Sequence, residues 1–252
     1  MTWLLTLAFD GTEYCGFQVQ PNGRSVAAAF QDGLEAVLGC RPDIKGCSRT
    51  DAGVHALGFA LSFEAETRIP PEKLPLALNT KLPRDIRVLK AQRVPDGFHA
   101  RYAAHTKTYL YRIHNSPIDS PFEERYYCRI PGRLEVERMQ RAAAHFVGTH
   151  DFLALCAAHS SAAAHGDTVR TITACTVARS GEDIAITVTA DGYLYNMVRI
   201  LAGTLCEAGA ARLDPEAVPA ILASRDRKNA GPTLPAKGLF LHHVDYGKEA
   251  EG

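Results

Sequence analysis

One pattern of strands and helices occurs twice along the 252 residues, and this repeat constrains the fold more than any other feature. Alternating apolar residues indicate strands, whereas apolar residues at helical spacing, such as those between the N-cap candidate Ser25 and Gly39, indicate helices. The first half reads strand, helix, strand, strand, helix, strand over residues 2–9, 26–38, 43–48, 57–64, 71–79 and 86–94. The same order returns over residues 106–114, 134–147, 169–178, 184–190, 193–208 and 238–246, with an extra helix over 214–223.

Two β-α-β-β-α-β repeats predict an α+β fold made of two ferredoxin-like halves. We expect an N-terminal domain over 1–103, which carries the reactive loop described below, and a C-terminal domain over 104–252. We also expect the halves to pack as a pseudo-symmetric pair with an active-site cleft between them, because ligand sites favour such junctions.

Charge and composition exclude several classes of protein. The chain has 28 basic and 28 acidic residues, so binding to nucleic acid requires charge gathered on one face. The first residues lack the basic region of a signal peptide and no apolar run is long enough to cross a membrane, so we expect a cytoplasmic protein without a membrane partner. Seven scattered cysteines and ten histidines form no CxxC or HExxH pattern, so we expect neither metal nor cofactor.

The segment GCSRTDAGVHALG, residues 46–58, joins two predicted strands and holds the most reactive combination of side chains. It places Asp51 beside an arginine and a hydroxyl, among glycines that permit tight turns and close approach of a ligand. From these residues alone, an Asx-turn in which Asp51 bonds its own loop backbone is the favoured interpretation. The residues therefore leave a structural and a catalytic role open.

The same segment resembles the motif GRTDAGVHA of the TruA-type tRNA pseudouridine synthases. The resemblance extends in order to AFDGTEYCGFQVQ, LNTKLPRDIRV, FHARYAAHTKTYLYRI, GTHDF, RTI, YLYNMVRILAGTL and GLFLHHVDY, and so covers essentially the whole chain. Ser48, Phe59 and Tyr193 depart from the family's usual glycine, glutamine and phenylalanine. The resemblance implies isomerisation of uridine to pseudouridine in the anticodon stem-loop of tRNA, at positions 38, 39 and 40, by a homodimer.

The resemblance also implies roles for single residues. Asp51 corresponds to the catalytic aspartate, and Arg199 of the NMVR segment to the arginine that pairs with it. Tyr109 corresponds to the tyrosine that stacks on the target base and can take part in proton transfer at carbon 5. The carboxylate can attack C1′ of the ribose or C6 of the uracil, or can remove the C2′ proton, and the sequence does not choose among these routes. Arg49 corresponds to the arginine that fills the gap left by the extruded uridine.

Other residues of these blocks have less specific expected roles. Five basic residues within or beside the blocks are expected to bind tRNA phosphates: Arg24, Arg84, Arg101, Lys107 and Arg170. Sheet packing is the expected role of Tyr111, and a buried, hydrogen-bonded ring explains His55 and His99 as well as catalysis does.

Two other functions are compatible with parts of the sequence. LAFDGT resembles the DxDGT motif of aspartate-based phosphatases, but Ala8 stands at the nucleophile position, so this chemistry fails. A non-catalytic RNA-binding protein with a ferredoxin-like fold is the stronger alternative, because such modules also display tyrosines on a strand.

Overall fold

The computed structural model describes residues 1–21, 23–157 and 164–250. The chain divides into two compact units, Met1–Lys107 with Phe240–Gly252, and Thr108–Leu239. They are called unit 1 and unit 2 below. Among the described residues, no helix is long and apolar enough to span a membrane.

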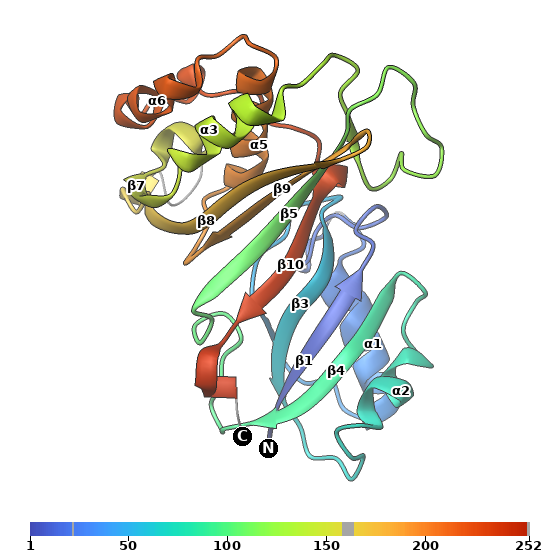
Figure 1. Ribbon diagram of the computed structural model, residues 1–252. Coiled ribbons are helices and arrows are strands. Elements are labelled where there is room, and N and C mark those ends of the chain that lie inside the picture. The colour runs from blue at the N-terminus through green and yellow to red at the C-terminus, as the bar shows by residue number, and fades with distance from the viewer. Residues whose placement is uncertain (22, 158–163, 251–252) are drawn as a thin grey trace. The chain divides into compact units, whose positions relative to one another are not determined.

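Unit 1 contains the ferredoxin-like order predicted for the first half. Its elements are β1 (Thr2–Phe9), α1 (Val26–Leu38), β2 (Ile44–Gly46), β3 (His55–Glu64), α2 (Leu74–Asn79) and β4 (Ile86–Val94). β1 lies between β4 and β3 and is antiparallel to both, and β2 is antiparallel to β3. The order β4-β1-β3-β2 is that of a split β-α-β fold. In Figure 1, α1 and α2 lie together beside β1 and β4.

The last strand of the chain also belongs largely to unit 1. β10 (Leu239–Asp245) is parallel to β3, and its partners there are His55 and Ala56. The compact units therefore differ from the predicted halves, because the chain returns to its first unit at the end. The division into domains 1–103 and 104–252, which follows the two repeats in the sequence, stays a prediction.

Helix α1 forms where the sequence places its caps. The Ser25 hydroxyl accepts a hydrogen bond from the backbone N–H of Ala28 at 3.2 Å, and Gly39 ends the helix with φ +73°. The apolar stripe of the helix, including Phe30 and Leu34, is fully buried. Each fully buried side chain of this kind contributes roughly 1.5–3 kcal/mol to folding, so the helix is held mainly by its packing.

Unit 2 combines a sheet with helices on one side of it (Figure 1). Its elements are β5 (Thr106–His114), β6 (Cys128–Arg129), α3 (Val136–Ala144), β7 (Gly148–Asp151), β8 (Val169–Ser180), β9 (Asp183–Ala190), α5 (Met197–Gly209) and α6 (Val218–Ser224). The strands follow the order β5-β9-β8-β7, with β6 paired to β5. The predicted α+β class is thus confirmed, whereas the pseudo-symmetric pairing and the cleft stay predictions.

Some boundaries differ from the sequence prediction. The helix expected over 193–208 begins only at Met197, because Asn196 adopts a left-handed conformation with φ +61° that interrupts a helix. Strands β6 and β7 were not predicted, since two and four residues are too few to show a period.

Candidate active site

Asp51 lies in the loop over residues 47–54, between β2 and β3, and is partly exposed. The backbone N–H of Val54 donates to the carbonyl of Asp51 at 3.2 Å, and Gly53 has φ +75°. A turn of four residues with a positive φ at its third position is type II, and glycine is the residue that this position favours. The turn presents Asp51 at its first position.

A second segment, residues 10–17, holds this loop from the side. The Phe17 N–H donates to the Thr50 carbonyl at 3.1 Å, and the Gly53 N–H donates to the Tyr14 carbonyl at 3.3 Å. These bonds flank Asp51 on both sides. The backbone around the carboxylate is therefore fixed by residues far away in sequence, as pre-organisation of a reactive group requires.

Glycines allow the two segments to approach each other. Gly16 has φ +104°, and a Cβ atom there would lie 2.6 Å from the Thr50 carbonyl oxygen. A Cβ at Gly11 would collide with the Val54 carbonyl. The first turn of α1 adds a further link, because the N–H of Val26 donates to the Gly16 carbonyl at 3.1 Å.

The loop rests on an aromatic pair. Phe17 and Phe59 stack with ring centroids 4.4 Å apart, and both rings are buried. Gly46 leaves room for the Phe17 ring, which a Cβ would meet. Phe59, one of the departures from the family pattern, therefore stabilises the base of the reactive loop.

The histidine of the motif serves the same scaffold. His55 is buried, with 1% of its surface exposed, and its Nδ1 accepts a hydrogen bond from the Gly11 N–H at 3.0 Å. Its ring stacks on Phe240 of β10 at 4.7 Å. This geometry supports the structural interpretation of His55.

Arg199 stands in the first turn of α5, in unit 2. Its Nε donates to the Leu234 carbonyl at 2.6 Å, and its Nη1 donates to the Asn196 side-chain oxygen at 2.8 Å. The Leu234 N–H in turn donates to the Arg199 carbonyl at 3.3 Å. Arg199 is a part-buried, oriented guanidinium and not the exposed helix arginine that its position alone suggests.

Tyr109 lies on β5 and is 6% exposed. Its ring meets Tyr193 edge-on, with centroids 4.9 Å apart, and the Tyr193 hydroxyl donates to the Val188 carbonyl at 2.8 Å. Burial raises the pKa of Tyr193 well above its usual range. Tyr111, two residues along, is fully buried and donates to the Pro235 carbonyl at 2.7 Å, in agreement with a packing role.

The basic residues expected to meet RNA differ in exposure. Arg49 and Arg101 are exposed, and the exposed Arg24 lies 4.8 Å over the Tyr14 ring. Lys107 is half-buried. Arg170 is held by Asp167 through contacts of 2.9 and 3.3 Å, so phosphate would have to compete with that carboxylate.

The predicted residues are distributed over both units. Asp51, Arg49, Arg24, Arg101 and Lys107 belong to unit 1, whereas the predicted residues of unit 2 are Tyr109, Arg170 and Arg199. The convergence of Asp51 with Tyr109 and Arg199 stays a prediction.

The clamp formed by Gly16 and Phe17 was not predicted from the sequence. Its only signal was a pair of glycines in the block AFDGTEYCGFQVQ, where a close approach of two backbones is one of several uses of glycine.

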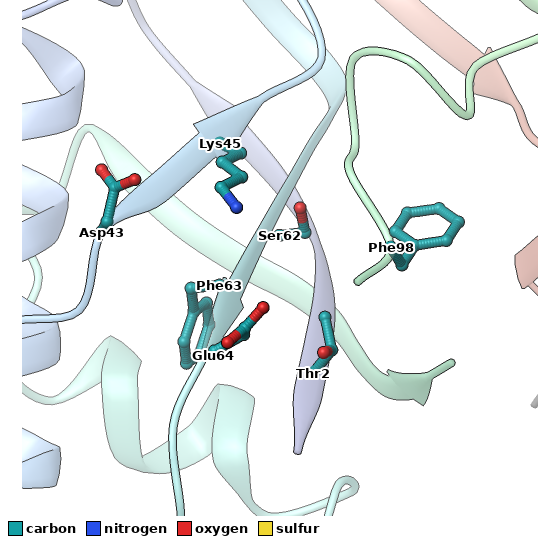
Figure 2. A pocket seen from close by; sticks show the side chains of 7 residues that line it. All are labelled: Thr2, Asp43, Lys45, Ser62, Phe63, Glu64 and Phe98. Carbon is teal, nitrogen blue, oxygen red and sulfur yellow. The ribbon is translucent and has the colours of Figure 1, made fainter. Parts of the chain in front are cut away.

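Unit 1 also contains a pocket of about 240 Å³, shown in Figure 2. Lys45 of β2, Ser62 and Glu64 of β3 and the Phe98 ring lie around it. No predicted site residue lines this pocket. Its volume therefore does not locate the candidate active site, which the loop geometry defines.

Comparisons with known proteins agree with the residue pattern. The family model described as tRNA pseudouridine synthase matches residues 6–103 and 142–247. The tRNA pseudouridine synthase A of Moorella thermoacetica is 47% identical over 96% of this chain and 98% of its own length. Those of Shouchella clausii and Caldicellulosiruptor saccharolyticus are 44% and 42% identical over 96% of this chain, and over 92% and 98% of their own lengths. The chain belongs to the tRNA pseudouridine synthase family and is an isomerase that forms pseudouridine in tRNA.

Proposed function

We propose that this enzyme modifies uridines in the anticodon stem-loop of tRNA, at positions 38, 39 and 40, and that Asp51 is the reacting carboxylate. The observation that carries the proposal is the placement of Asp51 at the head of a type II turn whose flanking peptide groups are both clamped by residues 14–17. The side chain is partly exposed while its backbone is held, which suits a group that must meet a substrate in one orientation.

The chemistry requires an ionised carboxylate. Asp51 can act as a nucleophile on C1′ or C6, or as a base on the C2′ proton, and each route needs a cation or hydrogen-bond donors to keep the carboxylate charged in a desolvated site. Arg199 is the proposed cation, because its guanidinium is oriented by Leu234 and Asn196. Tyr109 is proposed to stack on the target base, and Arg49 to occupy the space that the extruded uridine leaves.

Replacement of Asp51 by asparagine tests the catalytic role. Asp51→Asn should lower tritium release from tRNA labelled at carbon 5 of uridine by at least about 1000-fold, while tRNA binding changes little. Asp32→Asn, on the exposed side of α1, is the matched control and should keep wild-type turnover. Turnover retained by Asp51→Asn would contradict the proposal, and lost tRNA binding would assign Asp51 a structural role.

The same assay tests the proposed partnership with Arg199. Groups that act as a unit have strongly non-additive effects. The double variant Asp51→Asn, Arg199→Ala should therefore be no slower than Asp51→Asn alone. Additive losses would show that the two side chains act separately. Mapping of pseudouridine in the treated tRNA checks the target positions.

A further inference from the structure

Unit 2 brings together three side chains that are distant in sequence and chemically suited to a divalent metal ion. They are His114 at the end of β5, Asp183 at the start of β9, and Glu123 in the connection between β5 and β6. One donor atom from each lies within 4.8 Å of the others. The imidazole is buried, whereas the two carboxylates are half-buried and reachable from solvent.

The contacts of the His114 ring go beyond those of an ordinary hydrogen-bonded histidine. Two carboxylate oxygens converge on the single Nδ1 atom, that of Asp183 at 2.9 Å and that of Glu123 at 3.1 Å. Nδ1 carries at most one proton, so one hydrogen must serve both oxygens. A third carboxylate, from Glu182, lies 3.8 Å from Nε2.

Charge in this cluster also favours a cation. Three carboxylates around one imidazolium have three negative charges and one positive charge, a net charge of −2. A neutral imidazole would make the net charge −3. A divalent ion in the place of the Nδ1 proton would neutralise most of this charge and would bind all three donors at once.

The spacing of the donors fits a small transition-metal ion. Zinc binds imidazole nitrogen and carboxylate oxygen at about 2.0–2.2 Å, so two donors of a tetrahedral site are separated by about 3.3 Å. The Nδ1 to oxygen distances of 2.9 and 3.1 Å lie a few tenths of an ångström below this value. All three donor atoms lie within 4.8 Å of one another. To admit the ion, the two half-buried carboxylates must therefore move slightly away from Nδ1 and toward each other.

We propose that His114, Glu123 and Asp183 form a site for Zn²⁺ or a similar transition-metal ion, with water completing the coordination. The donor set of one nitrogen and two carboxylate oxygens favours this class over Ca²⁺ or Mg²⁺, which prefer oxygen ligands alone. The bound ion ties the segment between β5 and β6 to the start of β9. Its role is structural and independent of the reaction at Asp51.

Calorimetry with Zn²⁺ alone tests the site on the full chain without a tag, after treatment with chelator and its removal. Wild type should bind one ion per chain, and His114→Ala and Asp183→Asn should each weaken binding by at least about 10-fold. His145→Ala is the matched control, because His145 contacts a single carboxylate, Glu216 at 2.9 Å. This variant should bind Zn²⁺ as wild type does.

Two further readouts make the outcome decisive. Zn²⁺ should raise the thermal midpoint of wild type but not that of Asp183→Asn, since a ligand stabilises only the state that binds it. Co²⁺ should give a visible spectrum without the near-ultraviolet band of sulfur ligation. No binding by wild type, unchanged binding by both variants, or a sulfur band from a cysteine such as the exposed Cys40 would each overturn the proposal.

Discussion

The close approach of Gly16 to the loop that carries Asp51 makes a quantitative prediction. In Gly16→Ala the new Cβ would lie 2.6 Å from the Thr50 carbonyl oxygen, whereas ordinary contacts begin at 3.4 Å. The two segments must therefore separate by about 0.8 Å, the difference between these distances. Displacement of a reactive group by about 1 Å costs on the order of 100-fold in rate.

The same substitution also strains the backbone. Gly16 has φ +104°, a value at which a side chain costs about 1–3 kcal/mol. We expect Gly16→Ala to lose that much stability and to lower kcat about 100-fold. Tritium release under saturating tRNA measures kcat, and urea unfolding followed by circular dichroism measures stability.

Gly39→Ala is a control that strains the backbone without displacing the loop that carries Asp51. Gly39 also has a positive φ, +73°, but a Cβ there meets nothing within 4 Å. This variant should lose about 1–2 kcal/mol of stability and keep wild-type kcat. If folded Gly16→Ala turns over as fast as Gly39→Ala, the clamp does not position Asp51 and the reasoning is refuted.

Two further predictions concern other side chains of unit 1. Burial, and then the nearby Lys45, lower the pKa of His99. The contribution of His99 to the free energy of unfolding is therefore fully present above about pH 6.5 and is lost as the pH falls through the lower folded-state pKa. His99→Gln should remove this part of the acid sensitivity, and an unchanged slope of unfolding free energy against pH would contradict the prediction. Phe17→Ala removes a buried ring stacked on Phe59 and should lower the free energy of unfolding by about 3–5 kcal/mol. Phe17→Leu should lower it by under about 1.5 kcal/mol. Denaturant unfolding distinguishes these values, and similar losses of stability in both variants would show that ring packing does not support the loop.

The long elements are predictable from the sequence because their signals are local. The cap residues Ser25 and Gly39 set both ends of α1 as expected. The predicted start of the helix at residue 193 was wrong, because Asn196 adopts a left-handed conformation and α5 begins only at Met197. A non-glycine residue with positive φ gives no reliable sign of itself in the sequence.

For the candidate site, the motif identified Asp51 but not what holds it. The Phe17 N–H donates to the Thr50 carbonyl at 3.1 Å, and the Gly53 N–H donates to the Tyr14 carbonyl at 3.3 Å. Each of these hydrogen bonds connects residues more than 30 positions apart. Backbone groups carry no residue identity, so such bonds leave almost no trace in the sequence.

The sequence by itself therefore predicted the repeated order of elements, the family, and Asp51 as the candidate carboxylate. Periodicity, caps and a contiguous motif are properties of neighbouring residues. The tertiary structure alone decided that β10 lies parallel to β3, and that His114, Glu123 and Asp183 meet around one imidazole nitrogen. The spacing of ligand residues along the chain shows no metal motif, because these three residues lie on separate parts of the chain and only the packing of unit 2 brings them together.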